Sequence, residues 1–236
     1  MKSLVVWLCL TSLCWAGSAR DFDGTNDEVN WGDQTQYQMV SAVSHCFWLD
    51  MDATGFQTAF GKPDHSTHTS PFFDYSAELT PESGRIQART DSVFTNTGTG
   101  LFVDGTWAHV CSVWDGAINS GSLDVYIDLS KTDGSNTTTN ITDGAQTLRS
   151  GENVADTSDL NAQLAYVVLY NRLLTAAEVA ELQIRPDTIL DGMVLNCPML
   201  GDDPEIDWSS YKQAGTVSGS TSITDGPPVI LGDAPL

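Results

Sequence analysis

The sequence has few basic residues: ten lysines and arginines stand against 31 aspartates and glutamates, which gives a formal net charge of −21. A charge of this sign repels nucleic acid and anionic membrane surfaces, so neither is expected as a partner. Long apolar runs are also scarce. The run at residues 4–15 is shorter than the roughly 20 residues that a membrane span needs. We therefore expect no membrane insertion once this segment is removed.

Residues 1–19 have the composition of a secretory signal peptide. Lys2 supplies the charged start, the apolar run follows, and residues 16–19 are small, as is typical of a cleavage site. This predicts a secreted, extracellular protein, or one displayed on a cell or virion surface. An uncleaved N-terminal strand is the alternative. Cysteine is sparse too, since the chain has five. Cleavage after Ala19 would leave three of them, of which two can pair in an oxidising compartment.

Residues 107–129 are typical of two strands joined by a loop. Leu123, Val125, Ile127 and Leu129 alternate with Asp124, Tyr126 and Asp128. This period of two predicts a strand with one buried face and one wet face. Residues 108–114 are apolar on both faces apart from His109 and Ser112, which predicts a strand covered on both sides. The chain is therefore expected to be an all-β protein.

This hairpin, W-x-H-V-C-x-V-W-D-G followed by L-x-V-Y-I-D, resembles the central hairpin of the laminin-G-like and pentraxin group. Residues 44–49 and 163–179 resemble the early core strand of that group and its late strand with a short helix, in the same order. The resemblance covers roughly residues 21–182. It implies a concanavalin-A-like jelly-roll β-sandwich of two antiparallel sheets with one short helix. Thr175 and Glu178 form a capping box that starts this helix.

The length and order of these pieces predict a signal peptide at 1–19, a jelly roll at 20–190, and a C-terminal strand with an extended tail at 191–236. The apolar residues 193–199 are expected to complete the chain's own sheet beside the opening strand near Phe22. Insertion into a neighbouring subunit, and hence self-association, is the alternative. Prolines in the last ten residues predict that they form no regular element.

The resemblance also implies a disulfide, because pentraxins carry one at the positions that match Cys46 and Cys111. Two buried free thiols remain the alternative. Cys197 is then unpaired, either buried or available to another chain.

Calcium is the metal that the resemblance implies, since relatives often hold it at the rim of the concave face. The matching loops here contain Asp64, Glu152, Asn153 and Asp156, whose oxygen atoms suit this ion. A solvated acidic surface is the alternative. No other cofactor is expected. Asn136 and Asn140 each begin an N-x-T sequence, which becomes glycosylated only in a eukaryotic secretory pathway.

The segment Glu205-Ile206-Asp207 is similar to the start of the E-x-D-x-x-E strand of jelly-roll glycosidases, in which two carboxylates act as nucleophile and acid. Ser210 stands where the third carboxylate should be, so no catalytic residue is predicted. The tryptophans at 31, 107, 114 and 208 either stack on sugars or pack in the core, and the hairpin pair at 107 and 114 is expected to pack.

These observations predict a secreted, non-catalytic module that binds a glycan or an extracellular protein at the loop end of a jelly roll, with calcium as an expected aid. Two alternatives stay open. One is a structural protein that self-assembles into a surface layer, fibre or virion decoration. The other is an unusual glycoside hydrolase.

Overall fold

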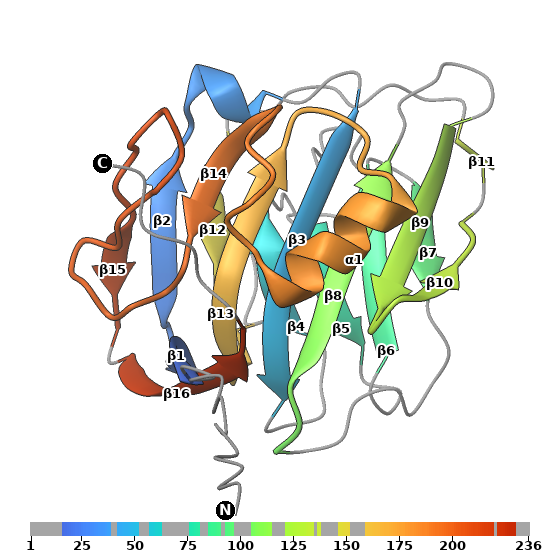
Figure 1. The fold of residues 1–236 in the computed structure, drawn as a ribbon. Helices are drawn as coiled ribbons and strands as arrows, with labels where there is room; N and C mark the ends of the chain where they lie inside the picture. Colours follow the sequence, from blue (N-terminus) through green and yellow to red (C-terminus); the bar gives the residue numbers. More distant parts are fainter. Residues whose placement is uncertain are drawn as a thin grey trace, which may run out of the picture.

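The computed structural model describes residues 16–38, 42–51, 57–62, 76–80, 85–90, 93–96, 105–114, 121–134, 136–137, 146–151, 159–219 and 221–229. Within these residues the chain forms two antiparallel sheets, one α-helix and one short 3-10 helix (Figure 1). The architecture confirms the predicted jelly-roll sandwich.

The first sheet contains nine strands among the described residues. From one edge to the other they are β10 (Ser130–Thr132), β9 (Gly121–Ile127), β8 (Ala108–Trp114), β3 (Val43–Met51), β13 (Asn161–Tyr170), β1 (Ala16–Asp23) and β16 (Ser222–Pro228). In addition, β11 (Asn136–Thr137) pairs with β9, and β14 (Met193–Cys197) pairs with β13.

The second sheet contains seven strands in the part of the chain that the structure describes. Their order is β15 (Thr216–Ser218), β2 (Glu28–Gly32), β12 (Leu148–Ser150), β4 (Gln57–Gly61), β5 (Ser76–Thr80), β6 (Arg85–Thr90) and β7 (Val93–Asn96). The 3-10 helix η1 (Thr35–Tyr37) follows β2.

The central hairpin forms as predicted, with Val110 opposite Ile127 and Trp114 opposite Leu123. The apolar positions of β9 up to Ile127 are buried. Leu129 is the exception, because the strand ends two residues earlier: Leu129 has a φ of 70° in the turn into β10 and is 48% exposed. The apolar positions therefore follow the expected alternation as far as Ile127. Tyr126, which was expected on the wet face, is instead 8% exposed and packs in an apolar cluster with Leu182.

The main core lies between the two sheets. Side chains from β3, β8 and β13 pack against side chains from β2, β4 and β12; the largest include Phe47, Leu49, Trp114, Trp31 and Phe60. Burial of these apolar side chains is the chief favourable contribution to folding. Because the inner faces of both sheets form this core, their outer faces remain for other contacts.

The helix α1 (Ala176–Ile184) packs on the outer face of the first sheet, across β3 and β8 in Figure 1. Thr175 and Glu178 form the predicted capping box, in which each side chain bonds the backbone N–H of the other. Val179 and Leu182 are fully buried against the sheet. Arg172 adds an ion pair to Glu178 at 2.7 Å and holds the pKa of that carboxyl at about 2.

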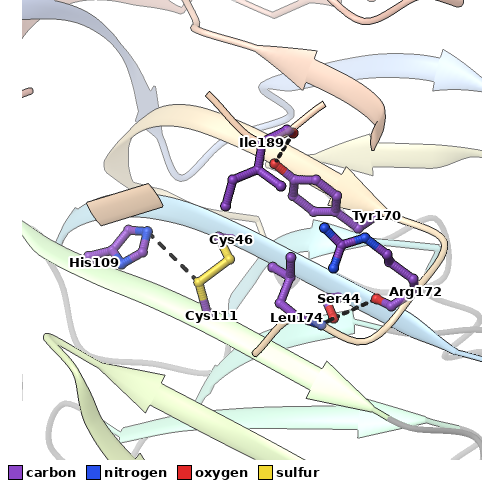
Figure 2. Close-up of a disulfide and its surroundings, with 8 residues drawn as sticks. All are labelled: Ser44, Cys46, His109, Cys111, Tyr170, Arg172, Leu174 and Ile189. Atoms are coloured by element: carbon purple, nitrogen blue, oxygen red, sulfur yellow. Dashed lines mark hydrogen bonds between the residues drawn. A yellow bond between two sulfur atoms is a disulfide. The ribbon is translucent and has the colours of Figure 1, made fainter. Parts of the chain in front are cut away.

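Beneath α1, Cys46 and Cys111 are joined by the predicted disulfide, which links β3 to β8 (Figure 2). The connection from β13 to the helix is fixed beside it, because Ser44 donates its hydroxyl to the carbonyl of Arg172 and accepts from the N–H of Leu174. Cys197 is a free, buried thiol. Burial raises its pKa well above the usual value, so it stays protonated and inert.

The C-terminal segment joins the chain's own sheet, but not in the predicted place. β14 pairs with β13, with Val167 opposite Cys197, and does not pair with β1. The ten-residue β13 is long enough for β1 to occupy one half of an edge and β14 the other. Pro227 and Pro228 also belong to a strand, β16, contrary to expectation. They are tolerated because β16 is an edge strand.

The polar segment at 130–144 contains β10 and β11, which both pair with β9. The beginning of β1 also overlaps the predicted cleavage region. A Cβ atom at Gly17 would lie 1.8 Å from the hydroxyl of Tyr166, and Ala19 is fully buried. Residues 17–19 therefore pack as part of the sheet, and the cleavage position remains a prediction.

Candidate ligand-binding groove

A surface groove lies at the edge of the second sheet. At this edge β15 runs beside β2 (Figure 1). Its cavity volume is about 310 Å³. The lining residues are Glu28, Asn30, Trp31, Gly32, Gln34, Gln213, Ala214 and Thr216. Most of these side chains are amides, hydroxyls or a carboxylate, so the groove offers hydrogen bonds to a ligand.

The alternation of β2 places the polar side chains in the groove. Val29 and Trp31 are buried in the core, whereas Glu28, Asn30 and Gly32 are half-buried on the opposite face. Successive residues of a strand point to opposite faces, so Glu28 and Asn30 share a face. β15 continues this face, because Thr216 stands opposite Asn30 and Ser218 opposite Glu28.

The other wall is built by the tail, and Asp207 holds it in position. One carboxylate oxygen of this buried residue accepts from the N–H groups of Asn196 and Ser209, at 2.9 and 2.8 Å. The other accepts from the N–H of Gln213 at 3.0 Å and from the hydroxyl of Ser209 at 2.7 Å. Asp207 therefore joins β14 to the segment that carries Gln213.

Gly215 and Glu205 bring the tail close to β2. Their backbones exchange two hydrogen bonds of 2.9 Å. A Cβ atom at Gly215 would lie 2.6 Å from Nε1 of Trp31 and 2.7 Å from Cγ1 of Val29, so no larger residue fits without displacement. Trp31 itself packs edge-on to Phe60, and its indole N–H has no hydrogen-bond partner.

Charge at the groove is concentrated in one ion pair. Glu28 accepts from Nη1 of Arg149 at 2.8 Å, and Arg149 lies on β12, beside β2. The same guanidinium donates to the hydroxyl of Thr147, and the side chain is almost completely buried. Ser218 donates to the second oxygen of Glu28 at 3.3 Å. Both charged groups are thus held by the protein.

Glu205 and Asp207 have structural roles. Glu205 is buried, pairs with Arg20 and accepts from the N–H of Gly201 at 2.9 Å. Burial raises the pKa of Glu205, while the hydrogen bonds from Arg20 act in the opposite direction. Neither carboxylate lines the groove, where Glu28 is the single carboxylate among the lining residues. Glycoside hydrolysis ordinarily needs two carboxyl groups across the scissile bond, and the lining residues supply one.

The structure describes few of the other sequence-predicted site residues. Asp64, Glu152, Asn153, Asp156 and Asn140 lie outside the described residues. Asn136 lies in β11, opposite Ser122 on β9. Calcium binding and glycosylation therefore stay predictions.

Sequence reasoning missed the groove itself. The alternation in residues 28–32 places Glu28 and Asn30 on one face, and that signal was available. Its second wall, around Gln213, comes from a segment more than 180 residues further along the chain, and no local pattern announces that pairing. Of the tryptophans that were expected either to stack on sugars or to pack in the core, Trp31 and Trp114 are buried in the core.

Comparison with known proteins identifies the fold. Residues 23–180 match the family model of laminin-G type described as the concanavalin A-like lectin/glucanases superfamily. No curated protein matches the chain. A crystal structure from Bacteroides ovatus, described as a candidate carbohydrate binding protein, superposes with a TM-score of 0.69 at 12% identity; it covers 91% of this chain, which spans 62% of that protein.

Two further solved structures are similar. The heptameric SAP-like pentraxin of Limulus polyphemus has a TM-score of 0.61 at 14% identity, over 89% of this chain and 96% of that one. The Trypanosoma rangeli sialidase in complex with sialic acid has a TM-score of 0.50 at 17% identity, over 70% of this chain but 27% of the sialidase. Among the described residues, no helix is long and apolar enough to span a membrane.

Proposed function

The chain belongs to the concanavalin A-like lectin/glucanases superfamily, and from this we propose that it is a secreted, non-catalytic carbohydrate-binding module whose sugar site is the groove between β2 and residues 213–216. The observation that carries the proposal is the lining of the groove. Asn30, Gln34 and Gln213 each offer amide donors and a carbonyl acceptor, and Thr216 adds a hydroxyl. Sugar hydroxyls need both kinds of partner.

The sandwich supports the site from three directions. Asn30 Oδ1 accepts from the N–H of Gly32 at 2.8 Å, which leaves the amide NH₂ of Asn30 as the donor for a ligand. Asp207 fixes the backbone of Gln213, and the core holds β2 through Val29 and Trp31. Side chains fixed before binding lose less conformational entropy when the ligand arrives.

Secretion fits the Cys46–Cys111 disulfide, because such bonds persist in oxidising compartments. Calcium at Asp64, Glu152, Asn153 and Asp156 is a separate part of the proposal. Elemental analysis of the purified secreted protein tests it, and binding assays with and without a chelator show whether the ion assists the groove.

A glycan microarray followed by isothermal titration calorimetry with the best sugar tests the proposed site. We expect Asn30→Ala and Gln213→Ala each to weaken binding about three- to tenfold, the effect of losing one neutral hydrogen bond of about 0.5–1.5 kcal/mol. Asn171→Ala is the matched control, because Asn171 is an exposed amide at the end of β13, away from the lining. Unaltered affinity in both groove variants would reject the site, and an array without any bound glycan would reject the function.

A further inference from the structure

We propose that the groove selects neutral, hydroxyl-rich sugars and rejects glycans that carry carboxylate or sulfate groups. This inference rests on the proposed function of the same groove, and it concerns which class of glycan binds there.

No lysine or arginine is among the residues that the structure shows lining the groove. Arg149 is the cation on the neighbouring strand, but it is 8% exposed, pairs with Glu28 and donates to Thr147. Lys212 precedes Gln213, and its ammonium group contacts the carbonyl of Trp208 at 3.5 Å. An anionic group in the groove would lose hydration without gaining a partner charge.

The groove itself already contains one acidic side chain. Glu28 lines the groove as a carboxylate, which accepts hydrogen bonds and donates none. A sugar hydroxyl can donate to it, whereas a sulfate or a uronate would meet a like charge. The net charge of −21 adds repulsion at longer range.

Contact between this groove and a sugar depends on hydrogen bonds. Trp31 is 1% exposed, so the face of its ring is not available for stacking on a sugar. Recognition therefore falls to the amides, the hydroxyl and the carboxylate, which match sugar hydroxyls on either the donor or the acceptor side. The volume of about 310 Å³ lies at the small end of ligand pockets, which hold about 300–1,000 Å³. A short stretch of sugar units suits this space.

Matched polysaccharide pairs test the inference: dextran against dextran sulfate, and methyl-esterified polygalacturonate against its free acid. The array also includes a broad panel of neutral oligosaccharides. We expect every bound glycan to be neutral, with an affinity that changes less than about twofold between 50 and 500 mM NaCl, because screening acts on charge–charge contacts. Preferential binding of the sulfated or acidic member overturns the inference but leaves the proposed function intact. Binding of no glycan overturns both.

Glu28→Gln sharpens the test, because it removes the acidic charge and, with it, the ion pair between Glu28 and Nη1 of Arg149. We expect this variant to bind dextran sulfate at least fivefold more tightly than the parent protein does, while Asn171→Ala behaves like the parent. If Glu28→Gln folds with an unchanged circular dichroism spectrum and gains no affinity for the sulfated polymer, the pairing of Glu28 with Arg149 is not what excludes anions, and the inference fails.

Discussion

The outer faces of the two sheets differ in what covers them. On the first sheet, α1 covers the Cys46–Cys111 disulfide and an apolar cluster that includes Tyr170, Val179 and Leu182. On the second sheet, the face around β2 and β15 carries polar side chains that border an open groove. The first face is closed by apolar burial and a covalent bond, whereas the groove is shaped by hydrogen bonds to the buried carboxylate of Asp207 and to the backbone of Glu205.

This difference separates stability from recognition. Changes beneath α1 should lower the free energy of unfolding without altering ligand affinity, since they lie on the other sheet. Changes to the supports of the groove should affect both properties.

Removal of the disulfide by Cys46→Ala with Cys111→Ala should lower the free energy of unfolding by about 4 kcal/mol, because the bond closes a loop with a sequence separation of 65 residues. Urea denaturation measures the loss, and titration calorimetry on the folded variant should return the affinity of the parent. A tenfold weaker affinity in the folded variant would show that the two faces are coupled.

Asp207→Ala should cost about 3 kcal/mol, because it leaves the N–H groups of Asn196, Ser209 and Gln213 without their buried acceptor. Asp207→Asn is the sharper variant. The side-chain oxygen of the asparagine can still accept hydrogen bonds from the N–H groups of Asn196 and Ser209. Its NH₂ group, however, faces the N–H of Gln213. We expect Asp207→Asn to retain most of the stability and to lose sugar affinity. Equal affinity in Asp207→Asn and the parent would argue against positioning of Gln213 by this carboxylate.

A chain that starts at Arg20 should be less stable than one that starts at Gly17 by about 2 kcal/mol. It lacks the buried Ala19 and the pairing of Ser18 and Ala19 with β16. Urea denaturation of the two chains measures the difference, and equal free energies of unfolding would contradict the prediction. Intact mass spectrometry of the secreted chain tests the separate prediction of cleavage after Ala19, which gives Arg20 as the first residue.

Acid should weaken the protein through His45 and His109, whose pKa values burial lowers from 6.5 to about 3. Both rings stay neutral in the folded chain, whereas the unfolded chain binds their protons below pH 6.5. Their contribution to stability is complete above pH 6.5 and is lost as the pH falls toward 3. In His109→Gln, the dependence of unfolding free energy on pH between 6 and 4 should be shallower by about 1 kcal/mol per pH unit. Urea titrations at several pH values would contradict this if the two slopes coincide.

Much of the fold could be predicted because its signals are local. The alternation in β9, the mostly apolar sequence of β8 and the capping box at Thr175 each specify one element. The resemblance then placed Cys46 opposite Cys111, as the structure confirms.

The tail and the groove could not be predicted in the same way. The apolar residues of β14 indicate a buried strand, but its partner depends on β13 being long enough to take two neighbours on one edge. The groove depends on Asp207, whose sequence neighbourhood is typical of an acidic turn, and on Gly215, which no local pattern marks as a contact with β2. Their roles become visible only once the tail lies against β2.

The most direct test of the sugar site is a titration of isotopically labelled protein with a neutral oligosaccharide from the array, followed by nuclear magnetic resonance. The account predicts that the side-chain amide signals of Asn30, Gln34 and Gln213 shift together with the backbone signals of β2 and β15, while those of α1 stay in place. Shifts that gather around α1 and leave the three amides unchanged would contradict it.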